Sequence, residues 1–251
     1  MKTQNDVKQN VSVFNENVQK NGGFLNATNA SFSSRVANKR ITDSIYEYIR
    51  PTYKTLVDIG CGDGVYTNEI KHNFPNLSVE GFDPAFKAIK EAQERFPGVK
   101  FSVRNILDDN IPLFKKKFDV GVIRGVLHHL TDREKALRNA FKLTSNPIIM
   151  QPNGNNPVLK LIEKTLRYPI EHEEQSFLST TLSNWIRNAG GEITDFQYVG
   201  YAPFFFPTAP AKVIYFSSSF WKSCLLSNIF FRPSLSLRPA NVYEKGIFSR
   251  H

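Results

Sequence analysis

The chain has 251 residues, 41% of them hydrophobic and 22% charged, which suits one α/β domain with additions and supplies enough apolar side chains for a core. It carries 32 Lys and Arg against 23 Asp and Glu, a formal net charge of +9, but the basic residues are scattered and form no separate nucleic-acid-binding module. Its two cysteines, Cys61 and Cys224, lack the spacing of a metal site, and the first ten residues contain no apolar run, so we expect a cytoplasmic protein without a signal peptide or a metal.

The N-terminal part of the chain predicts an arm followed by a helix. Residues 1–32 are polar and rich in Asn, which favours a mobile arm. Residues 33–50 place apolar side chains at near-helical spacing, and Pro51 is expected to end the helix.

Short apolar strands then alternate with helices, which is typical of βαβ units and a parallel sheet. The predicted strands are residues 55–59, 77–82, 99–103, 118–123, 147–151 and 192–199. The predicted helices are residues 65–73, 85–95, 131–143 (capped by Thr131 or Asp132) and 179–188 (closed by Gly190-Gly191). We therefore expect an α/β fold with a doubly wound, mostly parallel, seven-stranded Rossmann-like sheet whose last strand, near 242–248, runs antiparallel beside the sixth.

The last fifty residues contain many aromatic side chains. We expect residues 33–199 to form the core domain, 200–240 an aromatic helical insertion over the sheet, and 241–251 the last strand and the C-terminus. Lys and Pro residues interrupt the apolar segment, so it contains no charge-free run of the ~20 residues that a membrane-spanning helix needs.

A glycine-rich motif follows the first predicted strand and opens a helix, as a nucleotide-binding turn does. It reads VDIGCGDG over residues 57–64, with glycines at 60, 62 and 64. A dinucleotide site has its last glycine one position later, where this chain has Val65. Asp58 would repel a pyrophosphate, whereas a cationic amino acid bearing a sulfonium would be attracted.

A second acidic residue lies at the end of the second predicted strand, in the sequence GFDP of residues 81–84. Asp83 is about 20 residues past the glycines, where a carboxylate that accepts the two ribose hydroxyls is expected. Such a carboxylate would repel a 2′-phosphate.

Three motifs together, VDIGCGDG, GFDP and FDVGVIRGVLHHLTD, resemble the class I S-adenosylmethionine-dependent methyltransferases, and most of all their small-molecule branch. The resemblance spans about residues 33–199. It implies S-adenosylmethionine as the cofactor and these residues as its contacts: Asp58, Gly60, Cys61, Gly62, Gly64, Asp83, Pro84, Asn105, Ile106 and Arg124.

Within that set, the glycines and Asp58 would line the methionine part and Asp83 would hold the ribose. Asn105 stands where the family usually has an acidic residue against the adenine amino group, and its amide oxygen still accepts a hydrogen bond. Ile106 would cover one face of the adenine, and Phe82 or Phe86 the other.

The acceptor side contains the candidate catalytic residues His128 and His129, just after the fourth predicted strand. Histidine has the pKa range of a general base, which methyl transfer needs only if the acceptor loses a proton. The alternative is that one His caps the next helix or stacks within the loop. Arg124 is expected to bind an anionic acceptor or the cofactor carboxylate; for Arg35 and Arg40 the alternative is an exposed helix face.

Residues 171–174, Glu-His-Glu-Glu, follow the fifth predicted strand in a long excursion that is expected to border the acceptor pocket. They offer ligands for a metal, but a solvated charge run is the favoured interpretation.

We therefore expect a methyltransferase acting on a small-molecule or lipid- or sugar-linked acceptor. One alternative is a methyltransferase of RNA or another nucleic acid, which the net charge suggests; yet residues 124–127 read RGVL, without the Asn/Asp-Pro-Pro-Tyr/Phe signature of amino-group nucleic-acid methylases. Another is a non-catalytic S-adenosylmethionine-binding protein. Residues 204–231 either extend the core or roof the acceptor pocket and contact a membrane surface.

Overall fold

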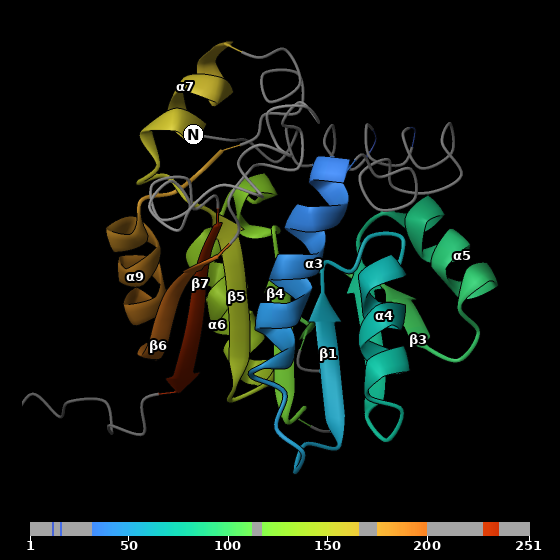
Figure 1. The fold of residues 1–251 in the computed structure, drawn as a ribbon. Helices are drawn as coiled ribbons and strands as arrows, with labels where there is room; N and C mark the ends of the chain where they lie inside the picture. Colours follow the sequence, from blue (N-terminus) through green and yellow to red (C-terminus); the bar gives the residue numbers. More distant parts are fainter. Residues whose placement is uncertain are drawn as a thin grey trace, which may run out of the picture.

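A central β-sheet with helices on both faces makes up the structure (Figure 1). The computed structural model describes residues 12, 16, 32–111, 117–165, 175–199 and 228–235. The strands are β1 (Thr55–Ile59), β2 (Ser78–Asp83), β3 (Lys100–Val103), β4 (Val120–Arg124), β5 (Pro147–Pro152), β6 (Gly191–Val199) and β7 (Asn228–Leu235). The helices are α3 (Phe32–Tyr46), α4 (Val65–Asn73), α5 (Phe86–Arg95), α6 (Arg133–Leu143), α7 (Pro157–Thr165) and α9 (Ser179–Asn188), with a short 3₁₀ helix, η2 (Leu127–His129).

The strands form one seven-stranded sheet in the order β3-β2-β1-β4-β5-β7-β6. Strands β1 to β5 pair in parallel, whereas β7 runs antiparallel to both β5 and β6. The predicted fold class, a mostly parallel seven-stranded sheet with an antiparallel last strand, is confirmed. The chain builds outward from β1 to β3 and then returns to place β4 on the other side of β1, so a topological switch point lies between β1 and β4.

The position of the last strand differs from the prediction. The seventh strand is Asn228–Leu235, which lies between β5 and β6, and residues 242–248 are outside the described residues. The expected helical insertion is therefore wrong over 228–235, because this aromatic and β-branched segment satisfies its backbone by pairing with two strands at once. Pro233 is tolerated in it beside a register irregularity of β6 between Ile193 and Asp195.

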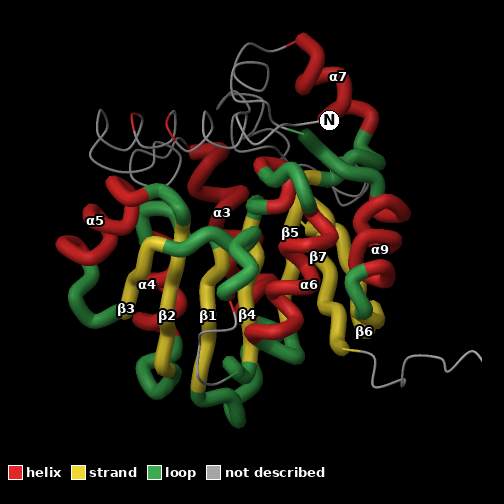
Figure 2. The backbone as a smooth tube through the Cα atoms, turned by 180° about the vertical axis from the view of Figure 1, so that it is seen from behind, coloured by secondary structure: helices red, strands yellow, loops and turns green. Residues whose placement is uncertain are grey.

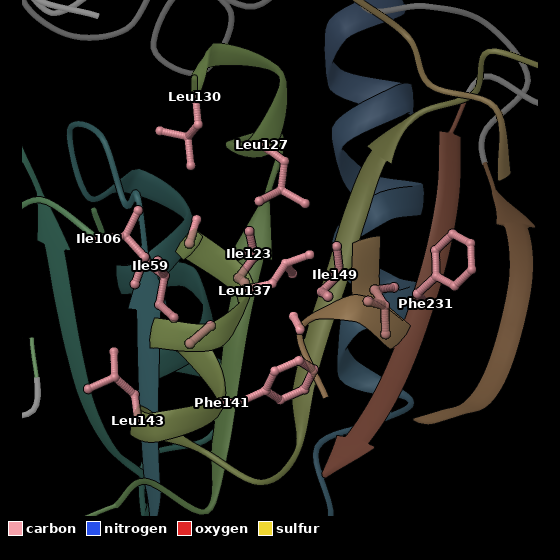
Figure 3. Close-up of a cluster of buried hydrophobic side chains, with 14 of the residues drawn as sticks. Ile59, Ile106, Ile123, Leu127, Leu130, Leu137, Phe141, Leu143, Ile149 and Phe231 are labelled. Atoms are coloured by element: carbon pink, nitrogen blue, oxygen red, sulfur yellow. The ribbon is translucent and has the colours of Figure 1, made fainter. Parts of the chain in front are cut away.

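The two faces of the sheet are covered by different helices. Helices α3 and α4 lie over one face and α6 and α9 over the other, as the opposite views of Figures 1 and 2 show. Side chains alternate along each strand, so Leu56 packs with α3, α4 and α5 while Val57 packs with α6 and α9. Figure 3 shows the second of these cores, in which Ile59, Ile123, Ile149 and Phe231 from four strands meet Leu137 of α6. Burial on both faces explains why the central strands read as continuous apolar runs.

The helix ends follow local rules that the sequence predicts. The Asp132 carboxylate caps α6 by accepting the Lys135 backbone N–H at 2.8 Å, and Gly190 adopts φ 91° after α9. Helix α3 ends at Tyr46, earlier than the expected residue 50. No helix within the described ranges has both the length and the apolar character needed to cross a membrane.

Replacing a buried residue of β7 tests the corrected topology. Phe231 is 1% exposed, so we predict that Phe231→Ala lowers the free energy of unfolding by about 3–5 kcal/mol. Phe86 is 64% exposed, and the control Phe86→Ala should change stability by less than about 0.5 kcal/mol. Urea denaturation followed by circular dichroism measures both, and equal losses in the two variants would contradict a buried β7.

Candidate active site

The glycine turn lies at the carboxyl end of β1, next to the switch point. Gly60, Gly62 and Gly64 adopt φ values of 77°, 56° and 76°, in the left-handed region that side chains with a Cβ rarely occupy. A Cβ on Gly60 would lie 2.4 Å from Val126 of the loop after β4, and one on Gly64 would lie 2.6 Å from Phe101 of β3. The turn is thus packed tightly against the residues of β3 and of the loop after β4.

Asp83, at the carboxyl end of β2, is joined to that turn. Its two carboxylate oxygens accept the backbone N–H of Gly62 at 3.1 Å and of Ala85 at 2.8 Å. The Phe82 carbonyl accepts from the N–H groups of both Gly60 and Cys61. The structure therefore brings the predicted ribose-binding carboxylate into direct contact with the predicted glycine motif.

Burial of the Asp83 carboxyl raises its pKa from 3.8 to about 6, although the hydrogen bonds from Ala85 and Gly62 favour the ionised form. Asp83 remains partly exposed, as do Pro84 and Cys61. Burial, followed by the negative charges of Asp58 and Asp83, raises the pKa of the Cys61 thiol. The side of the turn facing β2 thus has the electrostatics of a cation-binding site.

Asp58 lies under the turn rather than on its open surface. It is 5% exposed and its Oδ2 accepts the hydroxyl of Thr67, on α4, at 2.6 Å. Burial raises the pKa of Asp58 to about 6, while Thr67 and Arg124 act in the opposite direction. Sequence reasoning did not find Thr67, because its role depends on how α4 packs on β1.

Arg124, at the end of β4, is bound to α3 and α4. Its Nη1 donates to the Thr42 hydroxyl at 3.0 Å and its Nη2 to the Asn38 side-chain oxygen at 2.9 Å, while the guanidinium stacks 3.7 Å from the ring centre of Tyr66. Burial lowers the pKa of Arg124, and nearby Asp58 and Glu69 oppose this effect. The guanidinium thus holds α3 against the sheet, which the sequence did not reveal. Arg35 and Arg40 are exposed on α3.

The predicted adenine contacts lie at the end of β3. Asn105 uses its side-chain oxygen to accept the Leu107 N–H at 3.0 Å, which fixes the loop. Ile106 is buried in the core shown in Figure 3. Of the two aromatic candidates, Phe82 is buried in the same core, so only Phe86 presents an open ring, at the start of α5.

The histidine pair forms part of η2, directly after β4. His128 is 4% exposed, and its Nδ1 lies 3.2 Å from Oε1 of Gln151 at the end of β5. His129 is less buried, and its ring centre lies 3.9 Å from that of His128. His128 is thus packed within the loop, and His129 is the more accessible of the two histidines.

The loop after β5 is fixed by asparagine side chains. Asn153 accepts the N–H of Asn155, and Asn156 accepts the N–H of Leu159 and so caps α7. A Cβ on Gly154 would lie 2.5 Å from the Phe177 backbone, so this loop and the segment before α9 pack closely. Residues 171–174 lie outside the described residues, and no group of potential metal ligands occurs within the described ones.

Residues 57–146 match the methyltransferase domain family. The chain is 32% identical over 121 residues to a methyltransferase-like protein of Invertebrate iridescent virus 6, a match that covers 44% of this chain and 43% of the relative. It is 27% identical over 168 residues to the tRNA U34 carboxymethyltransferase of Nautilia profundicola, covering 62% and 53%. The chain thus spans about half the length of these curated relatives.

A solved structure with the same fold is the magnesium protoporphyrin IX methyltransferase of Synechocystis PCC 6803 with bound S-adenosylhomocysteine. The TM-score is 0.64 at 14% identity, covering 90% of this chain and 99% of that one. The fold and the glycine turn define a nucleotide-binding α/β domain with its site at the switch point. The match of residues 57–146 to the methyltransferase domain family agrees with the class I S-adenosylmethionine-dependent methyltransferase domain that the motifs imply.

Substituting a glycine of the turn tests how tightly the turn is held. We predict that Gly64→Ala destabilises the fold by at least about 1 kcal/mol, because alanine disfavours φ 76° and its Cβ would meet Phe101. Gly98→Ala is the matched control, since a Cβ there meets nothing within 4 Å, and its effect should stay within about 0.5 kcal/mol. Urea denaturation of both variants decides the matter; an equally stable Gly64→Ala protein would show that the turn tolerates a side chain.

Proposed function

We propose that the protein transfers a methyl group from S-adenosylmethionine to a small-molecule or lipid- or sugar-linked acceptor. The observation that carries the proposal is the junction of the glycine turn with Asp83, through the Gly62 N–H, at the switch point of the sheet. A bare backbone and a partly exposed carboxylate lie side by side there, which is the recognition surface that an adenosine joined to an amino acid requires.

The residues present fit that cofactor in three respects. The left-handed glycines form a tight turn whose backbone stays partly exposed at Gly60 and Gly62, where the methionine part would lie. Asp83 offers acceptors for ribose hydroxyls and would repel a 2′-phosphate. Asp58 and Asp83, both close to the turn, provide negative charge toward a sulfonium cation.

The chemistry is an in-line displacement. When bound, the cofactor would supply a methyl group on a cationic sulfur, and sulfur would keep the electron pair of the carbon–sulfur bond as the acceptor atom bonded to that carbon. The protein aligns the two partners at the carboxyl edge of the sheet and excludes water. Where the acceptor has a proton to lose, His129 of η2, just after β4, is the residue proposed to take it.

An RNA acceptor is the second candidate. It is supported by the similarity to a tRNA U34 carboxymethyltransferase over 62% of this chain, and by the net charge of +9. Incubation with methyl-tritiated S-adenosylmethionine and separated RNA, lipid and small-molecule fractions distinguishes the two proposals. Label in the lipid or small-molecule fraction is expected, and label in RNA alone would replace the first proposal by the second.

Calorimetry tests the cofactor site itself. We predict that the protein binds S-adenosylhomocysteine and not NAD, and that Asp83→Ala weakens binding by about 1–3 kcal/mol because ribose hydroxyls lose their acceptor. Glu80→Ala is the matched control, since this carboxylate lies on the same strand but pairs with Lys100 at 2.9 Å. NAD binding in place of S-adenosylhomocysteine, or equal losses in both variants, would contradict the proposal.

The dependence of cofactor affinity on pH follows from the same carboxyls. Asp58 and Asp83 have pKa values raised from 3.8 to about 6, and the cofactor favours their ionised forms. We predict that the affinity for S-adenosylmethionine is constant above these pKa values and falls as the pH drops through about 6, with a smaller fall in Asp83→Asn. Calorimetry across this range measures it, and an affinity that rises on acidification is the contrary result.

Folding stability depends on the ionisation of Asp58 and Asp83 in the opposite direction to cofactor affinity. Because their folded-state pKa values lie above the unfolded value of 3.8, their contribution to stability is complete below that value and is lost as the pH rises through about 6. The site thus gives up folding stability in order to hold ionised carboxylates at neutral pH.

A further inference from the structure

A glutamine is buried beneath the histidine pair. Gln151, near the carboxyl end of β5, is 0% exposed, and its side chain lies on the α6 side of the sheet, as does that of Ile149 two residues earlier. Its Oε1 lies 3.2 Å from Nδ1 of His128. The contact joins the end of β5 to the loop that follows β4. Strands β4 and β5 are neighbours in the sheet.

Burying the Gln151 amide at this position costs free energy. A glutamine has two acceptor lone pairs and two N–H donors, and within the described residues its Nε2 has no hydrogen-bond partner. A buried polar atom without a partner costs free energy, and a methionine would fill a similar volume without that cost. Packing therefore does not explain why residue 151 is a glutamine. The contact of its side chain with His128 does.

We propose that Gln151 is a positioning residue that accepts the Nδ1–H of His128 and so holds its neutral ring in the Nδ1–H tautomer. The hydrogen bond at one ring nitrogen determines which nitrogen carries the proton, and a fixed Nδ1–H leaves the lone pair on Nε2. The orientation of His128 in turn restricts His129, whose ring centre lies 3.9 Å away at an interplanar angle of 52°. That His128 and His129 lie near the methyl acceptor rests on the proposed function.

The tautomer is measured by long-range ¹H–¹⁵N NMR on the full chain labelled with ¹⁵N-histidine. The chain has five histidines, and the signals of His128 are assigned by their loss in His128→Gln. We expect Nδ1 of His128 to be protonated and Nε2 to carry the lone pair. An Nε2–H tautomer in the unsubstituted protein overturns the proposal, whatever the variants do.

Variants of Gln151 test whether its amide determines the tautomer of His128. Gln151→Met should shift the neutral ring toward the Nε2–H tautomer, which is the commoner form of free histidine. Gln151→Glu keeps an acceptor and should keep Nδ1 protonated. Gln197→Met is the matched control, since the Gln197 amide nitrogen also lies buried without a partner within the described residues but belongs to β6, away from the pair. Unchanged His128 signals in Gln151→Met, or equal changes in Gln197→Met, overturn the proposal.

A second measurement separates the role of Gln151 from the proposed function. Binding of S-adenosylhomocysteine by the same proteins, measured by calorimetry, reports on the cofactor site. We expect Gln151→Met to bind it with less than a twofold change in dissociation constant, because Gln151 lies on β5, and β4 separates β5 from β1 and its glycine turn. An unsubstituted protein with the expected tautomer and no S-adenosylhomocysteine binding would refute the proposed function alone.

Discussion

The hydrogen bond from the Gly62 N–H to Asp83 is the interaction on which the site depends. It joins the turn after β1 to the end of β2, and the Phe82 carbonyl adds two more bonds to the same turn. A parallel sheet brings the carboxyl ends of β1 and β2 to one edge. Glycines with positive φ then let the turn after β1 reach the Asp83 carboxylate. Folding and the proposed ligand recognition thus use the same few atoms.

The second constraint is the burial of opposite charges beneath that turn. Asp58 is held by Thr67, and Arg124 lies near enough to favour its ionised form while it binds Asn38 and Thr42 of α3. A buried charge is tolerated when it is paired or hydrogen-bonded, so the position of α3 is coupled to the electrostatics under the glycines. The helix before the first strand therefore supports the proposed site through Arg124, although it contributes no residue to the glycine motif.

Sequence reasoning succeeded where the determining interactions are local. The spacing of Gly60, Gly62 and Gly64 and the place of Asp83 identify the turn and the carboxylate beside it, because both lie at the carboxyl ends of adjacent short strands. It failed for β7, because pairing between β5 and β6 is non-local and the aromatic residues around Phe231 fit a helix or a strand equally well. Thr67, Tyr66 and Gln151 went unnoticed since each acts through a neighbour distant in the chain.

The central claim is that the surface formed by the glycine turn and Asp83 is the S-adenosylmethionine site. A crystal structure of the protein grown with S-adenosylhomocysteine tests it most directly. The account predicts ligand density with both ribose hydroxyls on the Asp83 carboxylate, the amino-acid part along Gly60–Gly64, and the sulfur toward the loop that contains His129. Density for the ligand elsewhere on the molecule, or a ribose that does not touch Asp83, would contradict it.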